Sequence, residues 1–351
     1  MINICMFGCR TCNLQCKYCM GPEKTNNEKF ILDENRLKSA IDLLIQKESI
    51  LSRFFIWGGE PLIHFEELKS TVDFLRNNYP ERKIAFSTNG VLLSNKKIQN
   101  FIISKKLRVQ LSVDGLAQSY RSNFNPLEDN STSVFLVELT KENLLSINCV
   151  MHKYNYSIKK NIQYFTNWMK KYDCLDSNLN IRFTPINESN LTPDYNLSGK
   201  RLKSFIHEYE ILYLHALLGK KNDSIYKHFI RFPLKIIKES NLKKCKWEYT
   251  NHCTKFATGI ISISKHIDTK GNFISCNLID SGIKPRGKEK KLIPEYCYKC
   301  KYKMTRGCWP CPAADFTEKC EFKKTWMQFQ ERMILLKKLI RNKKSIQKVH
   351  K

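Results

Sequence analysis

The sequence contains no run of roughly 18 apolar residues, so a membrane-spanning helix is not expected. The opening residues, MINICMFGCRTC, lack a basic segment followed by an apolar one. A secretory signal is therefore not expected, and we predict a cytoplasmic protein. Internal repeats and low-complexity linkers are also missing. With 351 residues, 42% of them hydrophobic, the chain is expected to fold into one large domain and a smaller one.

Acidic residues are scarce: 33 Asp and Glu face 60 Lys and Arg, which gives a formal net charge of +27. Two explanations for this excess of positive charge are considered. The first is that the lysines simply lie on solvated faces. The second is that they attract an acidic partner such as nucleic acid or an acidic peptide. The basic residues are spread along the whole chain, with the densest runs at 284–291 and 337–351. This even spread favours lysines on solvated faces over a binding patch for an acidic partner. No RNA-binding module is evident, so nucleic acid is not the expected partner.

Cysteine is abundant, with 15 residues. An odd count in a chain without a secretory signal points to reduced thiols and metal binding rather than disulfides. The cysteines fall mainly into two groups. The group at the start of the chain consists of Cys5, Cys9, Cys12, Cys16 and Cys19. The group between residues 245 and 320 consists of Cys245, Cys253, Cys276, Cys297, Cys300, Cys308, Cys311 and Cys320. Cys149 lies in a strand pattern and is predicted to be a small buried hydrophobe.

Short apolar runs alternate with longer helical patterns through the first half of the chain. The predicted strands are Ile2–Phe7, Phe54–Trp57, Ile84–Ser87, Val109–Val113, Ile147–His152 and Ile181–Pro185. Strands that alternate with helices form a parallel sheet, and six units are too few for a closed eight-stranded barrel. The sequence therefore predicts an α/β fold with an open partial (β/α)6 barrel, followed by a cysteine-rich domain.

Domain boundaries follow from the same patterns. The partial barrel is predicted over 1–195, a helical linker over 196–244, a cysteine-rich domain over 245–321 and a basic C-terminal helix over 322–351. The last helix carries a stripe of Trp326, Phe329, Met333 and Leu336, which favours a packed helix over a membrane or partner helix. The cysteine-rich domain has little apolar patterning and is expected to depend on metal for its fold.

Unusual loops follow four of the predicted strands. They contain the run from Cys12 to Cys19, then Gly58-Gly59-Glu60-Pro61, Thr88-Asn89-Gly90 and Asp114-Gly115. In a parallel α/β sheet, the loops at the carboxyl ends of the strands lie together and build the active site. The four loops are therefore expected to form one site.

The first of these loops has the spacing C-x3-C-x2-C, formed by Cys12, Cys16 and Cys19. Three thiolates at this spacing can hold three irons of a [4Fe–4S] cluster and leave the fourth iron open to a small molecule. A structural zinc site needs four ligands, and Cys9 could supply the fourth, although the CxxC pairs would be unusually close. A ferredoxin run would place a proline after its last cysteine, where this chain has Met20.

These motifs together resemble the radical SAM superfamily. The triple-cysteine loop with Tyr18 before its last cysteine, and Gly58-Gly59-Glu60-Pro61 after the second strand, resemble two of its signatures. The resemblance implies that the backbone and Glu60 hold the amino group of S-adenosylmethionine (SAM). It also implies that Ser87, Asn89, Ser112 and Asp114 line the ribose and carboxylate, and that Arg121 pairs with the carboxylate.

Family resemblance also implies the chemistry. The reduced cluster would cleave SAM into methionine and a 5′-deoxyadenosyl radical, which takes a hydrogen atom from the substrate. An external one-electron reductant of the flavodoxin or ferredoxin type would be needed. The protein would orient the cofactors and exclude water.

The downstream cysteines resemble the SPASM extension of peptide-modifying radical SAM enzymes. Its usual pattern is C-x2-C-x5-C-x3-C, whereas this chain has x7 and x2 at the second and third spacings, which leaves the ligand pairing open. The resemblance implies two auxiliary [4Fe–4S] clusters, one on Cys245, Cys253, Cys276 and Cys311, the other on Cys297, Cys300, Cys308 and Cys320. A zinc ribbon with a short loop is the alternative.

The substrate expectation also follows from this resemblance. It implies a maturase that acts on a ribosomally made precursor peptide and installs a carbon–carbon or thioether crosslink by net oxidation. We expect no leader-binding domain in front of the first strand, so a separate leader-binding protein or the basic surface would recognise the leader. Sulfatase maturation is disfavoured, because Asn277 follows Cys276 where those enzymes have Asp. Alternatives are a peptide epimerase, a small-molecule or RNA-modifying radical SAM enzyme, and a non-catalytic zinc or electron-transfer protein.

Overall fold

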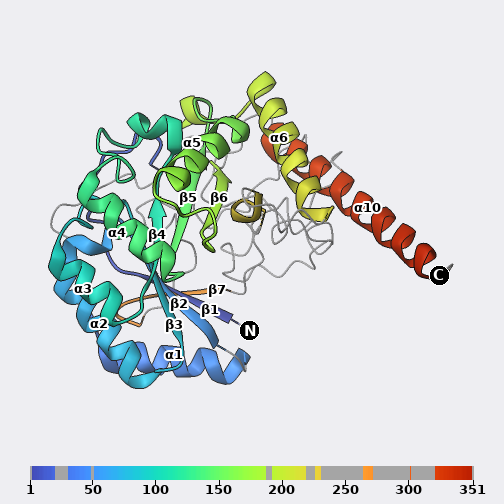
Figure 1. The fold of residues 1–351 in the computed structure, drawn as a ribbon. Helices are drawn as coiled ribbons and strands as arrows, with labels where there is room; N and C mark the ends of the chain where they lie inside the picture. Colours follow the sequence, from blue (N-terminus) through green and yellow to red (C-terminus); the bar gives the residue numbers. More distant parts are fainter. Residues whose placement is uncertain are drawn as a thin grey trace.

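The computed structural model describes residues 2–19, 31–48, 51–186, 192–218, 226–230, 264–271, 301 and 321–349. Its centre is one parallel sheet of seven strands in the order β6-β5-β4-β3-β2-β1-β7 (Figure 1). The strands are β1 (Ile2–Phe7), β2 (Leu51–Trp57), β3 (Lys83–Thr88), β4 (Arg108–Ser112), β5 (Leu145–Met151), β6 (Asn180–Pro185) and β7 (Ser264–Asp268). The six predicted strands and the predicted parallel α/β fold are confirmed.

Helices connect the strands, as a parallel sheet requires. They are α1 (Glu34–Glu48), α2 (Phe65–Asn78), α3 (Lys96–Ser104), α4 (Asn130–Lys141) and α5 (Ile158–Lys171), with short 3₁₀ turns η1 (Pro61–His64), η2 (Gly115–Tyr120), η3 (Pro193–Tyr195) and η5 (Tyr226–His228). Side-chain oxygens cap several of them: Asn95 begins α3, Asp129 begins α4 and Ser157 begins α5. The caps explain why these helices begin where the strand–helix pattern changes.

One strand was not predicted. β7 lies within the region expected to be the cysteine-rich domain, yet it pairs in parallel with β1 at the edge of the sheet, from Asn3 against Ser264 to Phe7 against Asp268. Its sequence, SKHID, has none of the apolar alternation that marks the other strands. The barrel sheet therefore draws on a segment more than 250 residues from its first strand, and the remaining domain boundaries stay predictions.

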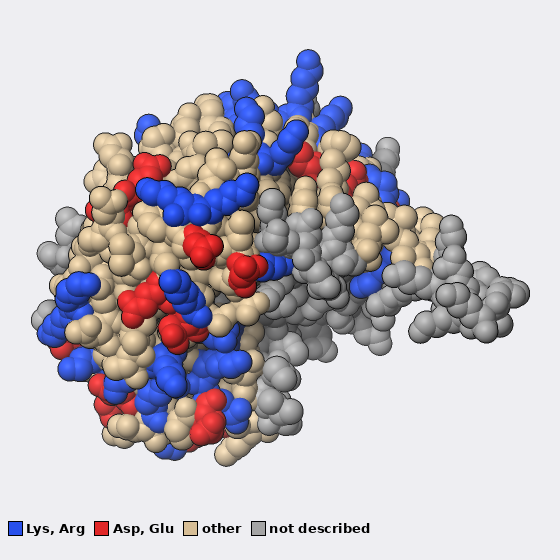
Figure 2. Space-filling model, viewed as in Figure 1, with Lys and Arg blue, Asp and Glu red and all other residues tan. Residues whose placement is uncertain are grey.

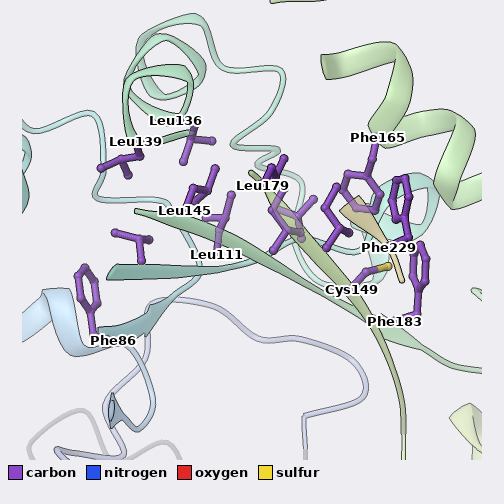
Figure 3. Packing of buried hydrophobic residues seen from close by; sticks show 14 of the residues in the cluster. Phe86, Leu111, Leu136, Leu139, Leu145, Cys149, Phe165, Leu179, Phe183 and Phe229 are labelled. Atoms are coloured by element: carbon purple, nitrogen blue, oxygen red, sulfur yellow. The ribbon is translucent and has the colours of Figure 1, made fainter. Parts of the chain in front are cut away.

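The core lies on one face of the sheet, under the helices. In β5 the residues Leu145, Ile147, Cys149 and Met151 alternate with more exposed neighbours, so one face of the strand is buried. Figure 3 shows Leu136 and Leu139 of α4 packing toward this face beside Leu111 and Leu145. Cys149 is fully buried in this cluster, as predicted.

The opposite face of the sheet is polar on β4, β5 and β6. On three neighbouring strands, Arg182 donates from Nε to Asn148 Oδ1 at 2.7 Å and from Nη2 to Gln110 Oε1 at 2.7 Å. Burial, together with the charge of Arg53, lowers the pKa of Arg182 to about 10. A polar inner face and an apolar outer face explain why the strands read as alternating rather than as continuous apolar runs.

The C-terminal helix packs as predicted. α10 (Glu321–Val349) lies beside α6 (Gly199–Leu217) and extends away from the sheet (Figure 1). Trp326 and Phe329 are buried against Tyr209, with ring centroids 5.2 and 5.7 Å away, and Arg332 forms an ion pair with Glu210. Among the described residues, no helix combines the length and apolar character that crossing a membrane requires.

Surface charge is dispersed on the face in view. Figure 2 shows lysine and arginine side chains scattered over it among fewer acidic ones. The basic side chains of this face do not gather into a single patch.

Candidate functional site

The cysteine loop follows β1 at the carboxyl edge of the sheet. Cys12 and Cys16 are partly exposed and Cys19 is exposed, and the cysteines of the described residues are all thiols rather than disulfides. A turn in which the Cys19 amide donates to the Cys16 carbonyl at 3.0 Å brings the last two cysteines together. Three accessible thiols therefore lie on one short loop, as the motif predicted.

The loop is fixed to the end of β2 by backbone hydrogen bonds. The Gly59 amide donates to the Cys9 carbonyl at 2.7 Å, and the Glu60 amide donates to the Thr11 carbonyl at 2.8 Å. A Cβ atom on Gly59 would lie 2.1 Å from the Thr11 oxygen, and one on Gly58 would lie 2.4 Å from the Cys9 oxygen. Both glycines are needed because two backbones approach each other here.

Glu60 ties the second loop to the third. Its buried carboxylate accepts from the Asn89 amide at 2.7 Å and from the Leu62 amide at 3.1 Å, which caps η1 at Pro61. Burial raises the pKa of Glu60 to about 7, and the hydrogen bonds from the two amides oppose that rise. Both carboxylate oxygens are thus occupied by backbone donors, whereas its predicted contact with the amino group of SAM stays a prediction.

The third loop also meets the cysteine loop directly. The Asn89 side chain donates to the Asn13 side-chain oxygen at 2.7 Å. Ser87 lies one residue before the end of β3, and Ser112 ends β4, so both are at the same edge of the sheet. The loops predicted from sequence to meet are therefore brought together, with Ser87 and Ser112 beside them.

Asp114 connects the fourth loop to two other segments and to Arg121 of the same loop. Its fully buried carboxylate accepts from the Tyr18 hydroxyl, from the Val150 amide at 2.9 Å, and from Arg121 Nε at 3.2 Å and Nη2 at 3.1 Å. Burial raises the pKa of Asp114, and the charge of Arg121 opposes that rise. The sequence indicated both residues as SAM contacts but did not reveal that they form an ion pair.

Arg121 links this ion pair to the cysteine loop. Its Nη1 lies 4.0 Å from Cys16 Sγ, and its guanidinium lies 5.6 Å from the centre of the Tyr18 ring. Burial works against its charge, but the charges of Asp114 and Cys16 outweigh burial and raise the pKa of Arg121. A permanent cation therefore sits beside a predicted cluster ligand, where it favours the thiolate form.

Sequence reasoning missed an aromatic group at the same edge. His152, directly after β5, is fully buried, and its ring lies 4.9 Å from Tyr18, 5.4 Å from Tyr120 and 5.6 Å from Tyr195. Tyr154 stacks on Tyr120 at 4.9 Å. These residues come from the loops after β1, β4, β5 and β6, so no local spacing marks them. Their one shared signal is their position just after strand ends.

The donor set of the cysteine loop fits an iron–sulfur cluster. A cubane cluster takes one thiolate at each of several irons, and this loop offers three thiols. Cys9, the possible fourth zinc ligand, is fully buried, and its thiol points to the Thr11 carbonyl at 3.9 Å. The eight downstream cysteines lie outside the described residues, so their predicted ligation stays a prediction.

Comparison with known sequences gives a family match over residues 6–160, to the Radical SAM superfamily. An uncharacterized protein of Methanocaldococcus jannaschii is 36% identical over 107 residues, which is 30% of this chain and 36% of the relative. The GTP 3′,8-cyclase of Paenarthrobacter nicotinovorans is 29% identical over 107 residues, 30% of this chain and 29% of the relative. A probable dual-specificity RNA methyltransferase of Chlorobium phaeobacteroides is 28% identical over 126 residues, 33% of this chain and 34% of the relative. The chain thus spans about a third of these relatives.

Solved structures with the same fold cover nearly the whole chain. Native anSMEcpe with bound AdoMet superposes with a TM-score of 0.61 at 18% identity, over 96% of this chain and 100% of the other. Streptococcus suis SuiB bound to its precursor peptide superposes with a TM-score of 0.56 at 13% identity, over 91% of this chain and 76% of the other. At such low identity these likenesses establish the fold alone. The family match and the cysteine loop in its expected place identify residues 6–160 as a Radical SAM domain.

Proposed function

We propose that this protein is a radical SAM enzyme that takes a hydrogen atom from a ribosomally made peptide and oxidatively installs a carbon–carbon or thioether crosslink. The observation that carries the proposal is the docking of the cysteine loop on Gly59 and Glu60, with Arg121 beside Cys16. That arrangement presents three thiols at the mouth of a partial barrel, where substrates of such folds bind.

Each residue of the site has a distinct task in this proposal. Cys12, Cys16 and Cys19 would hold a [4Fe–4S] cluster and leave one iron for SAM. When bound, the cluster and SAM supply a one-electron cleavage that yields a carbon radical able to take a hydrogen atom from the substrate. Glu60 holds the second and third loops together, and Asp114 holds Arg121 in place next to the cluster loop.

Two auxiliary clusters complete the proposal. Eight cysteines between Cys245 and Cys320 are enough to ligate two [4Fe–4S] clusters fully. A cluster near the substrate can accept the electron that remains after hydrogen abstraction, which makes a net oxidation possible. An external one-electron reductant would supply the electron for SAM cleavage, and a separate protein could present the leader of the peptide.

A peptide substrate is supported by the folds that resemble this one. SuiB was solved with its precursor peptide, and another anSMEcpe structure, with a TM-score of 0.59 and 18% identity, holds a peptide beside AdoMet. The sequence relatives favour a second candidate, because they include probable RNA methyltransferases. An RNA-modifying enzyme would use the positive charge of the chain to bind phosphates, and its binding would weaken steeply with salt.

The proposal is tested with the reconstituted full chain, SAM, a reductant and the short peptide encoded next to its gene. We expect a SAM-dependent loss of hydrogen from the peptide, seen as a mass decrease of about 2 Da per crosslink, since two hydrogens leave when one bond forms. Iron analysis of the same preparation should give about twelve irons per chain, for three four-iron clusters. An unchanged peptide mass contradicts the peptide proposal, and about four irons contradicts the auxiliary clusters.

A further inference from the structure

Among the described residues, His152 is a buried hydrogen-bond donor without an acceptor. Its Nδ1 accepts from the Tyr154 amide at 3.2 Å, so in the neutral ring the proton is on Nε2. That Nε2 atom is buried and has no hydrogen-bond partner in the part of the chain that the structure describes. Burial, together with the charge of Arg121, lowers the pKa of His152 to about 4, so the ring is neutral at pH 7. An unpaired buried donor costs about 1–3 kcal/mol, which marks a position where an acceptor is missing.

Further hydrogen-bond donors that have no partner among the described residues surround the His152 ring. Tyr120, Tyr154 and Tyr195 lie around it, and burial and the neighbouring tyrosines raise the pKa of Tyr195. Within the described part of the chain, none of these three hydroxyl groups has a hydrogen-bond partner, in contrast to the Tyr18 hydroxyl, which donates to Asp114. The tyrosine hydroxyls therefore add donors to the one on His152.

Three cations lie against the same rings. Lys17 Nζ lies 5.5 Å from the centre of the Tyr120 ring. Lys153 Nζ and Arg201 Cζ lie 5.4 Å and 6.0 Å from the centre of the Tyr154 ring. In the described residues, none of the three side chains forms an ion pair or a hydrogen bond. Two acidic groups of the described residues lie at this cluster: Asp194, which is exposed next to Tyr195, and Asp114, whose carboxylate is already occupied by the Tyr18 hydroxyl and Arg121. The cluster is therefore rich in donors and positive charge and poor in acceptors.

We propose that these residues form a subsite for a carboxylate of the substrate, carried by an Asp or Glu side chain of the peptide. The inference rests on the proposed function, since it names the chemistry of the peptide next to the modified position. A carboxylate accepts several hydrogen bonds at once and is attracted by all three cations. It therefore matches both the donors of this cluster that lack an acceptor and its positive charge. The subsite lies beside the cysteine loop, because Tyr18 is a member of the ring cluster.

Tyr154 is the ring of this cluster that faces solvent. Tyr154 is 44% exposed and stacks nearly parallel on Tyr120, with 7° between the planes. It is the most solvent-exposed ring of the group, whereas Tyr18 is buried. In this proposal, the Tyr154 ring is the one that turns to admit the carboxylate from the solvent side.

The test measures binding of two matched peptides to the reconstituted holoenzyme with SAM, by equilibrium dialysis with a radiolabelled acetyl group. The peptides are N-acetylated, C-amidated Ala-Asp-Ala and Ala-Asn-Ala, and N-acetyl-Ala-Ala-Ala with a free carboxyl end tests a terminal carboxylate. We expect the Asp peptide to bind at least about tenfold more tightly than the Asn peptide. Equal binding of the two peptides would overturn the proposal, and preference for the terminal carboxylate alone would overturn the side-chain assignment.

Two variants localise the effect. Lys153→Gln removes one cation, and Tyr154→Phe removes a hydroxyl while keeping the ring; each should reduce the acid preference by about threefold or more. Lys171→Gln is the matched control, because Lys171 lies over the Tyr172 ring at 5.0 Å in α5, outside the cluster. An acid preference that survives Lys153→Gln and Tyr154→Phe would refute this location. Peptide modification without acid preference refutes this inference alone, whereas acid preference without SAM cleavage refutes the proposed function alone.

Discussion

Replacement of Gly59 by alanine is expected to abolish cluster loading on the cysteine loop. The new Cβ atom would lie 2.1 Å from the Thr11 oxygen and 2.5 Å from the Arg10 oxygen, and both are backbone atoms that cannot turn away. The loop would have to move, which breaks the hydrogen bond from the Gly59 amide to the Cys9 carbonyl. We expect less than about a third of the wild-type iron on this loop and a loss of about 3 kcal/mol in the free energy of unfolding.

The measurement is iron content on a chain in which the eight downstream cysteines are replaced by serine, so that only the first cluster contributes, with urea unfolding alongside. Gly199→Ala is the control, because a Cβ atom there would meet no atom of the described residues within 4 Å. Alanine at the φ of +55° found at Gly199 costs about 1 kcal/mol in the free energy of unfolding. The iron content of the Gly199→Ala variant should equal that of the parent protein. Iron content in Gly59→Ala equal to that of the control would contradict the docking account.

The second large effect is expected from Asp114→Asn. The substitution keeps the shape of the side chain but leaves Arg121, which is 10% exposed, without its counter-charge. Breaking a buried ion pair by removing one partner costs about 3–5 kcal/mol, because the remaining charge is buried alone. We also expect weaker SAM binding, since Arg121 would no longer be held beside Cys16.

Urea unfolding and SAM titration of the reconstituted protein check this expectation. Glu66→Gln serves as the control, because Glu66 pairs with Lys97 on the surface, with both side chains more than 60% exposed, and should lose less than about 1 kcal/mol. The double variant Asp114→Asn, Arg121→Gln should recover part of the stability, since it removes the unpaired charge. If the single variant is as stable as the wild type, Asp114 does not hold the site together.

The sequence predicted the strands and the loops well because both depend on local patterns. Apolar alternation marked β5, and the glycines and cysteines marked the loops after β1 and β2. β7 was missed because an edge strand with the sequence SKHID needs no apolar face to pair with β1. Its position is set by the sheet rather than by its own residues.

Contacts within the site could not be predicted in the same way. The partners of Asp114 include Tyr18, 96 residues away, and Val150, 36 residues away, so their meeting depends on the register of the whole sheet. The contacts of Glu60 depend on the fold in the same way, because both of its carboxylate oxygens accept from backbone amides of the folded loops. Residue type indicated that these positions belong to the site, and the fold determined what they contact.

The central claim is that Cys12, Cys16 and Cys19 hold a cluster that cleaves SAM. It is tested most directly by measuring 5′-deoxyadenosine formed by the anaerobically reconstituted protein with SAM and dithionite. We predict SAM-dependent formation of 5′-deoxyadenosine by the wild type, and none by Cys16→Ala, which removes one ligand while leaving the downstream cysteines in place. A protein that binds iron fully but forms no 5′-deoxyadenosine, or one whose Cys16→Ala variant forms as much as the wild type, would contradict the account.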